Sequence, residues 1–219
     1  MSFKPPPKLP GLLEKVIRFK ALQHKQGKVL LHGIPVLLTL YFICIYLQKL
    51  LEKLYGKIPA ASILHHLGYT QAKQGIKLIN KRFGYAITIT DKRKLLEFHE
   101  GQAEIIGLGR FKISKFDFDK NIFILRGTST LACEYLKFFG LQKYPVDHFL
   151  RGGLVAAIES LTNKKMFCYE SKCIAKGNPF CEFVIRPIKA WNKKELKEQK
   201  IKELPDMEKL GAKCLHGLF

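Results

Sequence analysis

A hairpin motif near the C-terminal end of the chain constrains the fold more than any other stretch. Residues Cys168 to Val184, CYESKCIAKGNPFCEFV, have the pattern of a strand, a tight turn and a second strand. Gly177, Asn178 and Pro179 supply the bend, because glycine, asparagine and proline each favour turn conformations. We expect the rest of the chain to fold around this hairpin.

The hairpin carries three side chains of types that bind transition metals. Glu170, Cys173 and Cys181 follow the spacing E-x2-C-x7-C, and the bend brings the third residue back toward the first two. A structural zinc site normally has four ligands, so one more is required. Three nearby residues are alternatives for it: Asp147, His148 and Cys168. Against a metal site, paired cysteines in a hairpin are often only small buried residues.

Composition limits the classes of protein to which the chain can belong. Its 219 residues suffice for one large domain with a buried core and no disulfides. The six cysteines are scattered, and the opening MSFKPPPKLPG lacks the pattern of a signal peptide, so we expect a cytoplasmic protein with free or metal-bound thiols. A formal net charge of +20 attracts nucleic acid, anionic lipid or an acidic partner, but lysine-rich surfaces also serve solubility and ion pairing.

We expect one domain between two extensions. Residues 1–10 form a flexible, proline-rich arm, residues 11–191 the domain, and residues 192–219 a charged tail. The longest apolar run, Ile34 to Leu47, holds 14 residues, fewer than the roughly 20 that a spanning helix needs. It therefore predicts a buried helix, and we expect no transmembrane segment.

Apolar periodicity predicts mainly helices in the first half of the chain. The predicted helices cover 11–26, 36–55, 60–67 and 70–83, with an interrupted strand at 28–36. The last two helices, separated at Gly68, superficially resemble a helix-turn-helix, and Lys73, Lys77 and Lys81 form a basic stripe. Such a stripe is more typical of a solvated face, so we do not assign DNA recognition to it.

From Glu97 onward the apolar period changes from about 3.6 to about 2. This predicts a hairpin with its turn at Asp119 to Asn121, then a helix at 130–139, a small-residue helix at 152–161 and the closing hairpin at 165–185. The lysine-rich tail predicts a solvated helix. The fold class that follows is α+β, an antiparallel sheet flanked by helices.

The closing hairpin and its flanks resemble a known family. ESKCIAKGNPFCEFVI, with GGLVAAIESL before it and PIKAW after it, resembles the 4-vinyl-reductase-like small-molecule-binding domain. That domain also forms the sensor half of phenol- and xylene-responsive transcription activators, and its fold is related to subunits of the TRAPP vesicle-tethering complex. The resemblance covers roughly Gly27 to Trp191, and E-x2-C-x3-G-x3-C-x-F is its most specific part.

The resemblance implies a structural zinc site. In the aromatic-sensing members, the glutamate and the two cysteines of this motif bind zinc together with a cysteine in a Pro-Val-Cys loop. Carried over, the first three positions are Glu170, Cys173 and Cys181, and the loop is Pro145-Val146-Asp147, in which an aspartate replaces the cysteine. Asp147 is a chemically acceptable zinc ligand, with His148 or Cys168 as its alternatives.

The resemblance also implies an apolar ligand pocket beside the metal site, between the sheet and the helices. In the phenol sensors a histidine and a tryptophan orient the ligand hydroxyl, and the equivalent stretches here are LLEFHEG and FILRGTS. They offer Glu97 or His99, and Arg126. An inward Arg126 predicts an anionic or carboxylate ligand, because a buried guanidinium is costly unless paired; an outward Arg126 is one more basic surface residue.

We therefore expect a zinc-stabilised sensor or carrier domain for a small hydrophobic or aromatic ligand, and not an enzyme, because the sequence shows no nucleophile–base pattern or phosphate loop. A homodimer is expected, because related domains pair and Val36 to Leu54 offers more apolar surface than one core absorbs. The alternatives are a basic scaffold that docks nucleic acid, anionic lipid or an acidic partner, and an accessory protein or enzyme of tetrapyrrole metabolism.

Overall fold

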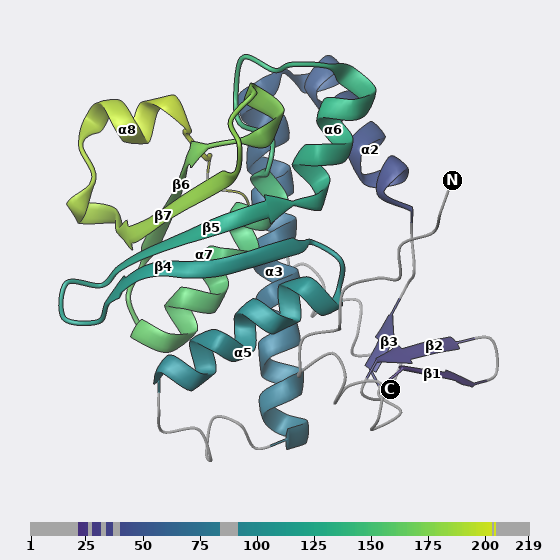
Figure 1. The fold of residues 1–219 in the computed structure, drawn as a ribbon, viewed down its shortest axis with the longest axis vertical. Helices are drawn as coiled ribbons and strands as arrows, with labels where there is room; N and C mark the ends of the chain where they lie inside the picture. Colours follow the sequence, from purple (N-terminus) through teal and green to yellow (C-terminus); the bar gives the residue numbers. More distant parts are fainter. Residues whose placement is uncertain are drawn as a thin grey trace.

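A four-stranded antiparallel sheet, in the order β4-β5-β7-β6, forms the centre of the fold (Figure 1). The computed structural model describes residues 22–25, 28–31, 34–36, 40–83, 92–202 and 204. One hairpin joins β4 (Gly109–Asp117) to β5 (Ile122–Ser129), and a second joins β6 (Met166–Lys172) to β7 (Cys181–Pro187). Both hairpins confirm predictions from the alternating pattern, but the alternation predicted from Glu97 onward is wrong up to Ile105, where the chain is still helical.

The pairing of β5 with β7 joins the two hairpins into one sheet. It sets Leu125 opposite Phe183 and Gly127 opposite Cys181. Phe123, Leu125, Phe183 and Ile185 are all at most 4% exposed, so these alternate residues form the inner face of the sheet. Cys181 lies in register with this inner face, which places it on the core side of a central strand.

Helices cover the inner face of the sheet. They are α3 (Lys57–Phe83), α5 (Lys92–Ile105), α6 (Thr130–Phe139) and α7 (His148–Thr162). Figure 1 shows α3 and α7 side by side behind the strands, with α5 across the β4 edge. The predicted α+β class, an antiparallel sheet flanked by helices, is therefore confirmed.

Two glycines allow α3 and α7 to pack closely. A Cβ added at Gly68 would lie 1.9 Å from the carbonyl oxygen of Phe149 in α7, and one added at Gly152 would lie 1.9 Å from that of His65 in α3. The predicted break at Gly68 is wrong: α3 runs through it without interruption. The glycine is required by the neighbouring helix rather than by a turn, so the helix-turn-helix pattern is absent from this segment.

The first described residues form a small antiparallel sheet and a helix. The strands β1 (Leu22–Lys25), β2 (Lys28–Leu31) and β3 (Ile34–Val36) pair in sequence order, and α2 (Tyr41–Tyr55) follows. The prediction of a helix over 11–26 is wrong at Leu22–Lys25, because these residues form a strand that pairs with β2. The remainder of that helix, residues 1–10 and most of the tail lie outside the described residues.

A short helical segment precedes the end of the described chain. After η2 (Ile188–Ala190), α8 (Lys193–Glu198) is capped at its start by Asn192, which shares reciprocal hydrogen bonds with Glu195. Figure 1 shows α8 beside β6 and β7. Of the helices that the structure describes, none combines the length and apolarity needed to cross a membrane.

Candidate metal site and adjoining cavity

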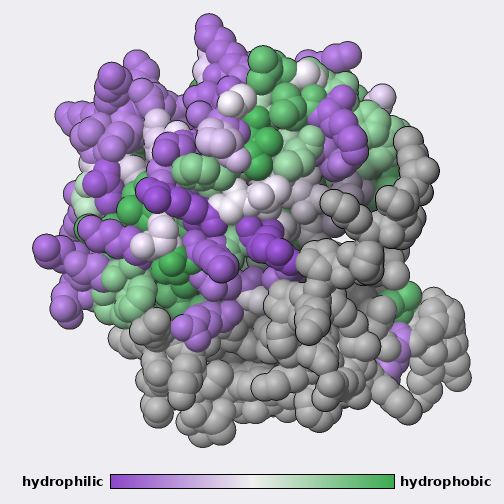
Figure 2. All heavy atoms as spheres, viewed as in Figure 1, coloured by the Kyte–Doolittle hydropathy of each residue, from purple (hydrophilic) through white to green (hydrophobic). Residues whose placement is uncertain are grey.

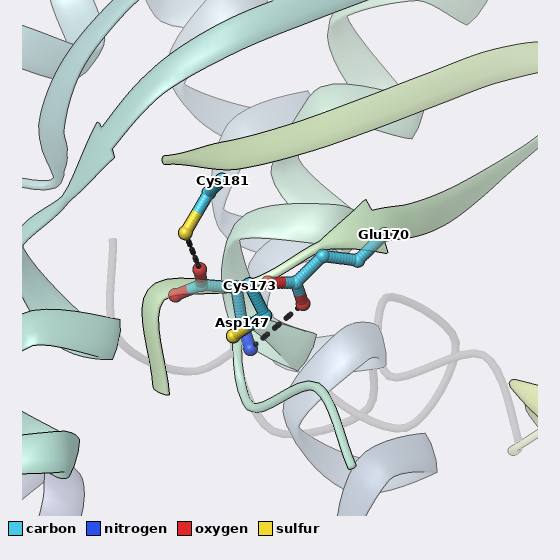
Figure 3. A group of neighbouring side chains, drawn as sticks. All are labelled: Asp147, Glu170, Cys173 and Cys181. Atoms are coloured by element: carbon cyan, nitrogen blue, oxygen red, sulfur yellow. Dashed lines mark hydrogen bonds between the residues drawn. The ribbon is translucent and has the colours of Figure 1, made fainter. Parts of the chain in front are cut away.

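Four ionisable side chains, two carboxyls and two thiols, meet where the β6–β7 hairpin contacts the start of α7 (Figure 3). Glu170 lies on β6, Cys173 directly after it, Cys181 opens β7, and Asp147 immediately precedes α7. One ligand atom from each lies within 4.8 Å of the others, and no residue is more than 1% exposed. The structure therefore brings together the hairpin triad and Asp147, one of its three predicted alternatives for a fourth ligand.

Backbone hydrogen bonds shape the turn between the two cysteines. The short helix η1 (Ile174–Lys176) follows Cys173, whose carbonyl oxygen accepts from Lys176 and Asn178 at 3.0 and 3.2 Å. Asn178 Oδ1 in turn accepts from the main-chain N–H of Cys173 at 2.9 Å. The N–H of Ile174 points to Cys181 Sγ at 3.3 Å, and such a donor favours the thiolate form.

Further contacts position the two carboxylates. The Ser129 hydroxyl donates to Asp147 Oδ1 at 2.5 Å, and the N–H of Asp147 donates to Glu170 Oε2 at 3.2 Å. Gln199 holds the backbone of Glu170 from the far side, accepting from its N–H at 2.9 Å and donating to its carbonyl at 2.8 Å. Glu170 Oε1 is buried and has no hydrogen-bond partner among the described residues.

The electrostatics of this group favour a cation. Burial raises the pKa of Asp147 and, more strongly, that of Glu170, whose ionised form also repels Asp147. The hydrogen bond between the two thiols lowers the pKa of Cys173 to about 7 and raises that of Cys181. Four groups that ionise in so small a buried volume repel one another, and a divalent cation at their centre would replace their protons and remove that repulsion.

The donor set fits a structural transition-metal ion. Two thiolates and two carboxylates can supply four ligands, and buried Glu170 Oε1 is an orphan acceptor that a cation would satisfy. Two of the predicted alternatives lie outside the group. Cys168 is buried on β6, two residues before Glu170. His148 contacts Arg151 instead, with its Nδ1 3.4 Å from a guanidinium nitrogen.

A fully buried arginine lies next to the site. Arg151, in the first turns of α7, donates from Nε to the carbonyl oxygen of Cys168 at 2.9 Å and from Nη2 to that of Gln199 at 3.2 Å. Burial and then the charge of Arg151 lower the pKa of both His65 and His148 to about 3. Both imidazoles are therefore neutral at pH 7, and Arg151 is the cation of this cluster.

A cavity of about 290 Å³ adjoins Arg151. Its walls come from the end of α2, the first turns of α3, the segment before α7 and the first turn of α7, and the residues at the end of α8. Gln199 lines the cavity and also hydrogen-bonds the backbone of Glu170. The three predicted ligand-binding residues, Glu97, His99 and Arg126, do not line it.

Those three residues lie elsewhere in the fold. Glu97 is exposed on α5, while His99 on the same helix is largely enclosed, and burial lowers its pKa to about 4. Arg126 lies on the outer face of the sheet with its side chain 52% exposed, and its Nε donates to Glu182 Oε2 at 2.5 Å. Of the two orientations considered for Arg126, the structure has the outward one.

The fold is shared with proteins of known structure. The chain matches the crystal structure of the phenol-responsive sensory domain of the transcription activator PoxR with phenol, at a TM-score of 0.73 and 18% identity. The match covers 87% of this chain and 96% of that one. The resemblance seen in the sequence is thus confirmed at the level of the fold.

Two further solved structures are similar. One is trafficking protein particle complex subunit 3 from Naegleria fowleri covalently bound to palmitic acid, with a TM-score of 0.43, 16% identity, and coverage of 67% of this chain and 93% of that one. The other is a vinyl-4-reductase family protein from Methanocaldococcus jannaschii, with a TM-score of 0.45, 13% identity, and coverage of 70% and 83%.

Two uncharacterized proteins of Methanocaldococcus jannaschii are related in sequence. MJ1642 is 31% identical over 92 residues, which are 42% of this chain and 48% of that protein, and MJ0150 is 24% identical over 143 residues, 62% and 80% respectively. The match thus spans about half the length of the first relative. No protein-family model matches the chain.

Sequence reasoning missed several residues that support the site. Ser129 and Gln199 act through hydrogen bonds to residues far along the chain, and their types are common at surfaces. Arg151 did have a signal: it is a lone cation within the otherwise apolar stretch HFLRGGLVAAI. A charge at that position of a buried helix calls for a partner.

Proposed function

We propose that the protein is a zinc-stabilised domain that binds a small molecule and acts as a paired sensor or carrier. The observation that carries the proposal is the buried group of Asp147, Glu170, Cys173 and Cys181, with ligand atoms within 4.8 Å of one another. A pair of thiolates favours zinc over magnesium or calcium, which prefer oxygen ligands. Four protein ligands fill a tetrahedral site and leave no position for a reacting water, so the ion would be structural.

The proposed ligand-binding role is supported by the cavity and by the fold. The cavity lies against the same segments that hold the metal ligands, so the ion would rigidify one of its walls. The fold is shared with a sensory domain whose crystal structure contains phenol. Small-molecule sites are typically pockets of this size and larger with a few polar groups in mostly apolar walls.

Pairing with a second copy is supported by the outer face of α2. Leu40, Ile43, Leu47, Leu50 and Leu54 recur at alternating spacings of three and four residues and are between 44% and 71% exposed. That heptad spacing is typical of helices that pack along one another, and a two-fold axis would set the same stripe against itself. Figure 2 shows hydrophobic surface gathered where α2 and α6 lie.

Metal analysis of the purified full-length chain tests the proposal. We expect one zinc ion per chain, and we expect its removal by a chelator to lower the midpoint of thermal unfolding, with recovery when zinc is restored. The sample is colourless if the ion is zinc. A chain that is isolated without metal, takes up none and unfolds identically with and without chelator would contradict the proposal.

A further inference from the structure

The side chains that line the cavity include more cations than anions. Its basic residues are Lys57 and Lys200 near the surface and Arg151 at the buried end. Its two acids are Glu52, whose Oε2 forms an ion pair at 3.8 Å with the ammonium of Lys49 outside the lining, and Glu198, whose Oε2 accepts from the Tyr169 hydroxyl. The cations therefore outnumber the acids that remain to pair with them.

Arg151 makes this imbalance costly. Its guanidinium is removed from water, and its polar contacts go to two carbonyl oxygens and to Nδ1 of His148. Among the described residues Arg151 hydrogen-bonds to no carboxylate, and Glu170 acts on it only through the charge attraction between them. Hydrogen bonds to neutral acceptors satisfy N–H groups but do not compensate the charge, and a buried cation is stabilised most by an anion that it can bind.

The rest of the lining is apolar. Ile58 and Ala61 of α3 and Val146 before α7 form walls, and Tyr144 lies nearby with the Lys57 ammonium 4.0 Å from its ring centroid. These surfaces suit a compact apolar or aromatic body, while the basic groups suit a single negative charge. A cavity of about 290 Å³ restricts the ligand to a small molecule.

We propose that this cavity binds a small carboxylate with an apolar body, its charge facing Arg151 and Lys57. The inference deepens the proposed function by naming the ligand class, and it depends on small-molecule binding but not on the identity of the metal. The anion-binding residue is therefore Arg151 and not Arg126, which lies on the outer face of the sheet. It adjoins the metal group through Gln199, which accepts from Arg151 and brackets Glu170.

Benzoate and benzamide form a matched pair of probes, because they share a shape and differ in charge. Titration of each into the full-length chain by calorimetry should show benzoate binding about tenfold tighter or more, since bonds to an ionised acceptor are the stronger ones. Lys57→Glu, at the mouth, should weaken benzoate about three- to tenfold and leave benzamide unchanged. Lys53→Glu, an exposed lysine of α2 outside the lining, and Arg126→Gln should change neither by more than about twofold.

The outcomes separate this inference from the proposed function. Equal affinity for the two probes, or no binding of either, in a chain that holds one zinc ion would overturn the carboxylate site, and the charge of Arg151 would then be compensated by the anionic ligands of the metal. The metal analysis also distinguishes the opposite case. A chain that prefers benzoate but takes up no metal would support the carboxylate site and contradict the zinc proposal. Equal losses of benzoate affinity in Lys57→Glu and Lys53→Glu would mean that only the overall charge of the protein matters, and would also overturn the site.

Discussion

The main-chain N–H of Asp147 donates to Oε2 of Glu170 across 3.2 Å, which ties the start of α7 to strand β6. The bond leaves Oε1 of Glu170 as the unpaired buried acceptor beside the two thiols. A backbone donor thus holds one carboxylate oxygen of Glu170 and leaves the other free to bind a cation beside the two thiols. The ligand group is held by the fold itself, which is the arrangement expected for a site of defined geometry.

Loss of one thiol should remove both metal and stability. We expect Cys173→Ser to lose most of its zinc and to lower the free energy of unfolding by about 3 kcal/mol or more, because binding energy at a structural site is folding energy. Zinc content and urea unfolding measure the two effects. Cys44→Ser is the control, since Cys44 lies half-buried on α2 outside the metal group. A Cys173→Ser chain with full zinc and full stability would refute the assignment.

Two glycines of one helix should respond in opposite directions to the same change. Gly68→Ala should destabilise by about 3 kcal/mol, because the new Cβ would meet the Phe149 carbonyl at 1.9 Å. Gly75→Ala should stabilise by up to about 1 kcal/mol, because no atom lies within 4 Å of its added Cβ and alanine favours helix. Urea unfolding compares them; equal effects would mean that the α3–α7 packing does not limit the residue.

Charges placed on the stripe of α2 should separate the two copies. We expect the wild-type chain to have the mass of a dimer by light scattering, and the double variant Leu47→Glu, Leu50→Glu that of a monomer, because two like charges would face their own copies across the axis. Lys53→Glu controls for added negative charge on the same helix. A wild-type chain that stays monomeric at high concentration argues against pairing through this face.

His99 should make the protein less stable in mild acid. Its pKa in the folded state is about 4, below the usual 6.5, because burial disfavours the charged ring. The unfolded chain therefore binds the proton more readily, and the stabilisation present above pH 6.5 is lost as pH falls toward 4, by roughly 3 kcal/mol. The free energy of unfolding measured across this range should fall less steeply in His99→Gln. An identical slope in the variant would mean that His99 does not titrate in this way.

Local patterns were sufficient for most of the secondary structure. Alternation predicted both hairpins, and the periodicity of TLACEYLKFF predicted α6 with its bounds, because strands and helices repeat at 2 and 3.6 residues whatever their neighbours are. The same reasoning failed at Leu22–Lys25, where pairing with β2 overrides the helical spacing. It failed at Gly68 as well, since a glycine that ends a helix and one that admits another helix look alike in sequence.

By itself the sequence determined the hairpin and its triad of Glu170, Cys173 and Cys181, because a turn of a few residues brings these side chains together without help from the rest of the chain. Only the tertiary structure decided that Asp147, rather than His148 or Cys168, joins them, and that Arg126 faces outward while Arg151 is buried. These outcomes depend on which face of a strand or helix meets the core. That choice is made by packing between segments distant in sequence, and no local spacing encodes it.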